Sequence, residues 1–119
     1  MSTTSGYRDL RAWQEAMKLV VMVYHVTSRF PREEIYGLTA QVRRSVVSVP
    51  SNIAEGAARN SAREFRHFLG VSAGSLAEVE TQLELATRLN YAQREPEIAL
   101  QAQKVGMLLE GLRRSFPAG

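Results

Sequence analysis

Apolar residues recur every three or four positions over most of the chain, which is the spacing of one face of an α-helix. We expect four helices, at about residues 9–28, 32–57, 62–90 and 96–115. The segments between them are short, so consecutive helices should run in opposite directions. The pattern therefore predicts an all-α fold, an up-down-up-down antiparallel four-helix bundle.

The second expected helix has an apolar stripe that continues through a proline. The stripe consists of Leu38, Val42, Val46, Val49, Ile53 and Ala57. Pro50 removes an amide donor and clashes with the carbonyl of Val46, which costs about 3 kcal/mol in an unkinked helix. Because the apolar spacing stays in register across Pro50, we expect one helix that is kinked there. The hydroxyls of Ser45, Ser48 and Ser51 could bond the freed carbonyls.

The first expected helix has two apolar stripes, which is more than the interior of one bundle needs. The first stripe consists of Leu10, Trp13, Met17, Val20, Tyr24 and Thr27. The second stripe consists of Leu19, Val23, Val26 and Phe30. We expect the second stripe to be either part of a wide core face or a contact between subunits. Asp9 is the expected N-cap of this helix.

The third expected helix has a run of small residues in its middle. Gly70 and Gly74 lie in its interior, where each glycine costs about 1 kcal/mol relative to alanine. Close approach of another helix would offset this cost, so we expect a tight helix–helix contact here. Ser61 and Glu64 have the spacing of a capping box, which places the start of the helix at Ala62.

The length and composition indicate a single domain. We expect residues 1–8 to be a disordered tail and residues 9–116 to form the bundle. The chain has no cysteine, which excludes disulfides, thiolate metal sites and a cysteine nucleophile. The N-terminus lacks the pattern of a signal peptide, and no apolar run approaches the ~20 residues that span a bilayer. These features lead us to expect a cytoplasmic protein.

The charge of the chain is positive and comes mainly from arginine. The formal net charge is +3, the pI is about 9.7, and thirteen of the fifteen basic residues are arginine. Five arginines and a histidine lie within residues 43–67, against only Glu55 and Glu64. Arginine binds phosphate bidentately and stacks on bases, so the bias fits nucleic-acid binding. An arginine-rich codon usage would produce the same bias without any such function.

Four polar residues follow one side of the second expected helix. They are Arg44, Asn52, Glu55 and Arg59. They could line a polar pocket that binds a ligand, or they could form a buried hydrogen-bond network that fixes the helix register. We favour the structural network, and an arginine that is used there is not available to phosphate.

Nothing in the sequence indicates enzyme chemistry. The serines lack a nucleophile-elbow setting, and there is no phosphate-binding loop or dinucleotide fingerprint. Glu64 and His67 could form half of a metal site, but no second pair of ligands accompanies them. We therefore expect a protein that is not an enzyme and that needs no metal or cofactor.

A set of residues along the chain follows one specific pattern. The central part comprises Phe30-Pro31, Glu34, Tyr36-Gly37-Leu38, Gln41, Arg43-Arg44, Val47-Ser48-Val49-Pro50, Asn52-Ile53-Ala54-Glu55-Gly56 and Arg59. This pattern resembles the "four helix bundle protein" family of bacteria, which is associated with intervening sequences in the large-subunit ribosomal RNA gene. The resemblance covers about residues 9–115. It implies a homopentamer, and it implies kinship with the accessory protein of a diversity-generating reverse transcriptase, which binds nucleic acid and the polymerase through a basic surface.

These observations lead to two hypotheses on function. The first is a homo-oligomeric, pentameric bundle that binds RNA or DNA without reading sequence. Its candidate phosphate contacts are Arg43, Arg63, Arg66, Arg88, Arg113 and Arg114. The second hypothesis is a protein-interaction scaffold or accessory subunit, for example to a reverse transcriptase, with no nucleic-acid role of its own.

Overall fold

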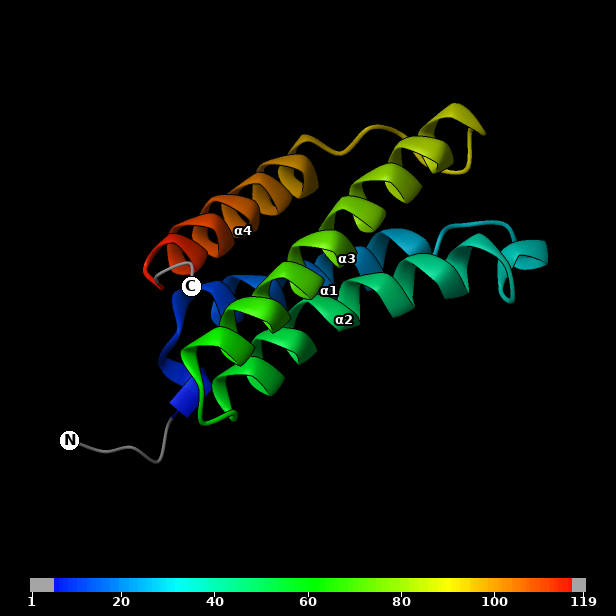
Figure 1. Cartoon of the computed structure of the whole chain (residues 1–119). Helices are drawn as coiled ribbons and strands as arrows, with labels where there is room; N and C mark the ends of the chain where they lie inside the picture. Colours follow the sequence, from blue (N-terminus) through cyan, green and yellow to red (C-terminus); the bar gives the residue numbers. More distant parts are fainter. Residues whose placement is uncertain (1–5, 117–119) are drawn as a thin grey trace.

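The computed structural model describes residues 6–116, and over this range it contains helices and no strand. The elements are the 3-10 turn η1 (Gly6–Asp9), α1 (Arg11–Thr27), the 3-10 turn η2 (Arg32–Glu34), α2 (Leu38–Ala57), α3 (Ala62–Arg88) and α4 (Pro96–Arg114). The predicted all-α fold of four helices is confirmed. Figure 1 shows that the α1–α2 and α3–α4 connections lie at one end of the elongated molecule, and the α2–α3 turn lies at the other.

The core lies between the four helices and is built from aliphatic side chains. The fully buried large apolar residues are Leu19, Val23, Val42, Val46, Val49, Ile53, Leu69, Val79, Val105 and Leu109. Burying each of these side chains stabilises the fold by roughly 1.5–3 kcal/mol. The apolar stripe predicted for the second helix accounts for four of these residues.

The two apolar stripes of α1 have different environments. The stripe that contains Leu19 and Val23 faces the core, so the expectation of a wide core face holds for it. The other stripe, which starts at Leu10 and Trp13, is only partly covered. Met17 is 42% exposed and Tyr24 is 40% exposed. This first stripe therefore leaves apolar surface of α1 uncovered.

The start of α1 differs from the expectation. Residues 6–8, which we assigned to a disordered tail, belong to η1, and the ring of Tyr7 packs on that of Trp13 at 5.2 Å between centroids. Residues 1–5 lie outside the described range. The N-cap residue is Leu10 rather than Asp9, because η1 ends at Asp9 and Leu10 N donates to Tyr7 O at 3.0 Å.

The second helix begins later than expected and runs through its proline. Arg32–Glu34 form the separate 3-10 turn η2, so α2 starts only at Leu38. Pro50 is inside α2, which remains one helix. The hydroxyls of Ser45 and Ser48 do not bond the freed carbonyls, because both are bonded to side chains of α3.

The two glycines of α3 are not what permits the close contact between α2 and α3. A Cβ on Gly74 would meet nothing within 4 Å, and one on Gly70 would meet only an arginine side chain at 3.8 Å. A Cβ on Gly56 of α2 would lie 2.9 Å from side-chain atoms of both Phe65 and Phe68. The glycine that permits the close approach is therefore Gly56.

Hydroxyl groups complete the α2–α3 contact. Ser72 Oγ of α3 donates to the carbonyl of Val49 at 2.8 Å, next to the proline. Ser48 Oγ and Ser75 Oγ share a hydrogen bond of 2.8 Å between the two helices. These bonds satisfy the buried polar groups of the contact, as the interior of a protein requires.

The ends of α3 follow the sequence signals. Ser61 Oγ accepts a hydrogen bond from Glu64 N at 3.0 Å, which confirms the predicted N-cap. Asn90 follows the helix with a φ of 63°, the left-handed conformation that asparagine tolerates better than most residues. Tyr91 N then donates to Ala86 O at 2.9 Å and closes the helix end.

Candidate nucleic-acid interface

The antiparallel course of the helices brings arginines from four segments to one end of the bundle. This end contains the start of α1, the end of α2, the start of α3 and the end of α4, with η1 in contact with α2 (Figure 1). We call it the arginine end, and its arginines are Arg8, Arg11, Arg59, Arg63, Arg66, Arg113 and Arg114. The acidic residues in the same segments are Asp9, Glu55, Glu64 and Glu110.

The opposite end has the reverse balance. Its arginines are Arg29, Arg32, Arg88 and Arg94. Its acidic residues are Glu33, Glu34, Glu84, Glu95 and Glu97. The positive excess of the chain is therefore not spread evenly, and an anionic partner would meet the arginine end first.

Arg66 connects the start of α3 to the end of α4. Its Nη1 donates to the carbonyl of Phe116 at 3.1 Å and to that of Arg113 at 3.5 Å. The rings of Phe65 and Phe116 pack beside these bonds, with 4.9 Å between their centroids. Arg66 therefore holds the last turn of α4 against α3, and this use competes with its predicted role in phosphate binding.

The other predicted arginines at this end differ in exposure and in whether another residue already binds their guanidinium. Arg63 and Arg114 are exposed, and neither has a hydrogen bond or ion pair with another described residue. Arg113 is half-buried and lies 3.8 Å from Glu110, while its Nε is buried without a partner among residues 6–116. Arg63 and Arg114 are thus the two predicted side chains best placed to reach a phosphate.

Two predicted arginines lie away from this end. Arg43 Nε donates to Thr27 Oγ1 at 2.9 Å, and its guanidinium lies 4.6 Å from the centre of the Tyr24 ring, so it joins α2 to α1. Arg88 pairs with Glu84 at 3.0 Å on the last turn of α3. It is twenty-five residues from Arg63 along α3, or about 37 Å at the rise of an α-helix. The six predicted arginines therefore do not form one surface.

The four polar residues of α2 do not form the buried network that we favoured. Glu55 and Arg59 form an ion pair of 2.6 Å, but both side chains are nearly half exposed. Asn52 Nδ2 donates to Ser48 at 2.8 Å and so joins the α2–α3 contact. Arg44 is exposed and reaches none of them. The set separates into a surface pair, a helix–helix contact and a solvated arginine, and Arg44 is about 12 Å from Asn52 along the helix axis, at the rise of an α-helix.

Two arginines of the interface were missed by the sequence analysis. Arg8 fell within the segment assigned to the tail, and Arg11 lay in the first turn of the expected helix 9–28 without being assigned a role. The guanidinium of Arg8 lies 5.3 Å from the centre of the Tyr7 ring and 5.9 Å from that of Trp13. Aromatic residues beside the arginine were the available signal, since such stacking keeps a guanidinium in place at the surface.

A carboxylate just before α2 caps that helix and joins it to the α3–α4 connection. Glu34 Oε1 accepts from Leu38 N at 2.8 Å, and Glu34 Oε2 accepts from the hydroxyl of Tyr91 at 2.8 Å. The Leu38 amide, and then the Tyr91 hydroxyl, hold the pKa of Glu34 below its ordinary value, and the Glu34 carboxylate raises the pKa of Tyr91. A Cβ on Gly37 would lie 2.5 Å from Glu34 Oε1, so the glycine leaves room for this cap.

A second carboxylate connects α1 to α4. Glu15 is buried, and its Oε1 accepts from Gln101 Nε2 at 2.9 Å. Lys18 lies 3.3 Å and Lys104 3.8 Å from its oxygens. The hydrogen bond from Gln101 is the largest cause of a lowered pKa for Glu15, and it outweighs the opposite effect of burial. Glu34 and Glu15 therefore stabilise contacts between elements of the fold, and within residues 6–116 neither forms a hydrogen bond or ion pair with the arginines of the arginine end.

Comparison with known protein families gives a match over most of the chain. A sequence model of the family described as 23S rRNA-intervening sequence protein matches residues 8–111. No match is found among curated proteins. Within residues 6–116 no helix is long and apolar enough to cross a membrane. The family match runs from η1 into α4 and includes the arginines of the α2–α3 turn, so the chain belongs to the 23S rRNA-intervening sequence protein family.

Proposed function

We propose that this protein is a non-enzymatic, homo-oligomeric bundle that binds nucleic acid through its arginine end. The observation that carries the proposal is the convergence of seven arginines, from four separate segments, on one end of the molecule. Contacts to phosphate need positive charge and reach, and they read no sequence. The proposed activity is therefore electrostatic binding of RNA or DNA, not base recognition.

Within the arginine end, the free side chains carry the proposed binding. Arg63 and Arg114 are exposed without partners among the described residues, and they come from adjacent ends of α3 and α4. Arg66 acts indirectly, since it holds the end of α4 against α3. Each phosphate that is neutralised releases counterions, so the affinity should fall steeply with salt.

The proposed function also includes association of several copies of the chain. The partly covered stripe of α1 has Met17 and Tyr24 at the surface, with exposed fractions of 42% and 40%, and the neighbouring Val21 is 56% exposed. A ring of five chains, as the family resemblance implies, would have a net charge of about +15 from +3 on each chain. Several weak sites on one particle then bind a long nucleic acid with avidity.

Charge reversal at the free arginines tests the proposal. We expect Arg63→Glu with Arg114→Glu to weaken binding of a labelled structured RNA at least tenfold at ~50 mM salt. The plot of log affinity against log salt should also lose about two units of slope for each chain that contacts the RNA, close to one for each phosphate contact. The measurement is fluorescence polarisation between ~50 and ~200 mM salt.

The matched control is Arg44→Glu with Arg88→Glu, which also reverses two exposed arginines, both away from the arginine end. It should leave the affinity within about twofold of the wild type. An equal loss from this control would show that only the net charge matters and would contradict the assignment of the arginine end.

A second function is favoured if the wild-type protein binds no RNA or DNA at the lowest salt. The protein would then be an interaction scaffold or an accessory subunit, for example of a reverse transcriptase. The partly exposed apolar stripe of α1 supports this alternative. So does the internal use of Arg43 and Arg66.

A further inference from the structure

A pocket of about 180 Å³ lies between α3, α4 and their connection. Its floor is apolar and includes Val26, Leu83, Ile98 and Ala102, three of which are buried in the core. A cavity of about 150 Å³ with an apolar lining is large enough to bind benzene. The pocket therefore has room for one aromatic ring.

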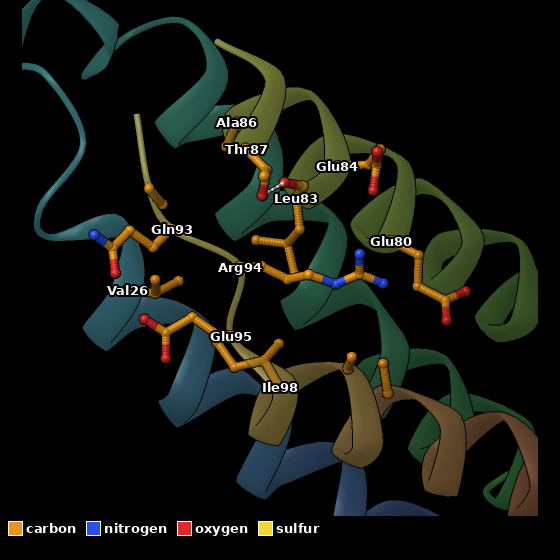
Figure 2. Close-up of a pocket in the computed structure, with 13 residues that line it drawn as sticks. Val26, Glu80, Leu83, Glu84, Ala86, Thr87, Gln93, Arg94, Glu95 and Ile98 are labelled. Carbon is orange, nitrogen blue, oxygen red and sulfur yellow. Dashed lines mark hydrogen bonds between the residues drawn. The ribbon is translucent and has the colours of Figure 1, made fainter. Parts of the chain in front are cut away.

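The rim of this pocket is polar. Glu80 and Glu84 of α3 and Arg94 of the α3–α4 connection line it. In Figure 2 the side chain of Arg94 extends from the connection toward α3. Arg94 has no hydrogen bond or ion pair with another residue in the described range, so its guanidinium is available to an entering group. A ring with a hydroxyl suits such a site, because the ring meets the floor and the hydroxyl meets the rim.

The chain itself presents a ring of this kind. Tyr36, in the connection between η2 and α2, is 94% exposed, the highest value among the large hydrophobic side chains described. Its neighbour Ile35 is 51% exposed, and Arg32 is exposed one turn earlier. An aromatic residue so fully exposed in a fixed turn is typical of a contact that the isolated chain does not show.

We propose that Tyr36 of one copy inserts into the α3–α4 pocket of the next copy. This inference rests on the self-association in the proposed function and identifies the contact that produces it. Arg94 would lie over the Tyr36 ring, and Arg32 would face the carboxylates of Glu80 and Glu84. Opposite charges thus meet around an apolar centre.

The positions of Tyr36 and the α3–α4 pocket on the bundle are compatible with a ring of subunits. The α1–α2 connection, which carries Tyr36, and the α3–α4 connection lie at the same end of the bundle (Figure 1). Tyr36 and the pocket are different surfaces of one chain, so their contact is heterologous, and such contacts close into rings when the rotation permits. The partly exposed stripe of α1 extends the same interface away from Tyr36 along the bundle.

Two variants, each lacking one half of the contact, test the proposal. Tyr36→Ala removes the ring and keeps the pocket, whereas Ala99→Trp blocks the pocket at an exposed lining position and keeps the ring. Each variant alone should be a monomer in light scattering after size exclusion at micromolar concentration. An equimolar mixture should form a dimer and no larger species, because one intact contact remains and both outer surfaces are defective.

Controls separate this proposal from folding defects and from the proposed function. Tyr36→Phe keeps the ring and should assemble like the wild type, and circular dichroism should show unchanged helicity in every variant. If Ala99→Trp misfolds, Thr87→Trp blocks the same pocket from α3. If the Tyr36→Ala variant forms the same oligomer as the wild type, or if the mixture forms no dimer, this contact is wrong. Self-association of the wild type would still hold in either case. A wild-type monomer would overturn both.

Discussion

At the scale of single residues, the start of α2 depends on one carboxylate and one glycine. Glu34 caps the first amide of α2 at Leu38 and also holds Tyr91 of the α3–α4 connection. The side chain can do this because Gly37 has no Cβ at the place where Glu34 Oε1 lies. The sequence Tyr36-Gly37-Leu38 therefore has a structural explanation for its glycine, while its tyrosine remains free for another contact.

Gly37→Ala should lower the melting temperature by roughly 5 °C, since the new methyl group displaces Glu34 and removes a helix cap. The measurement is thermal unfolding followed by circular dichroism. Gly111→Ala in α4 is the control, because a Cβ there meets nothing within 4 Å. A melting temperature that stays the same in Gly37→Ala would mean that the Glu34 cap contributes little.

At the scale of helices, small residues allow α2 and α3 to approach each other closely. Gly56 lies against Phe65 and Phe68, and Ser72 donates across the contact to the carbonyl of Val49. The sequence analysis recognised that small residues imply a close contact but assigned it to Gly70 and Gly74. Periodicity gives the face of a helix, and it does not give the depth at which a partner helix approaches that face.

We expect Gly56→Ala to destabilise the protein by about 1–2 kcal/mol, because the methyl group pushes α2 and α3 apart. Gly74→Ala, in open space on α3, should instead stabilise it by about 0.5–1 kcal/mol. Urea unfolding of the two variants against the wild type measures both values. The same sign for both would contradict the packing argument.

At the scale of the whole molecule, arginines are concentrated at one end of the bundle and glutamates at the other. Two carboxylates, Glu15 and Glu34, join helices and connections to one another. The arginine end and the opposite acidic end arise because the antiparallel course places the termini of different helices together. Glu15 between α1 and α4, and Glu34 between α2 and the α3–α4 connection, act inside this arrangement. The pKa of each of these two carboxyls is below its ordinary value, so both favour the folded state when they are ionised.

This sign predicts how stability changes with acid. A carboxyl whose pKa is lower in the folded than in the unfolded protein stabilises the fold above the unfolded pKa near 4.5. That stabilisation is lost as the pH falls through the folded pKa. The melting temperature should therefore drop below pH 4.5, and Glu15→Gln should flatten this dependence.

The sequence alone was enough to predict four helices, the apolar stripes of α2 and the Ser61 cap, because these features depend on neighbours within one or two helical turns. It also showed the excess of arginine. Whether an arginine meets solvent or a carbonyl depends on residues far away along the chain, as Arg43 with Thr27 and Arg66 with Phe116 illustrate. The gathering of arginines at one end was decided only when the helices packed together.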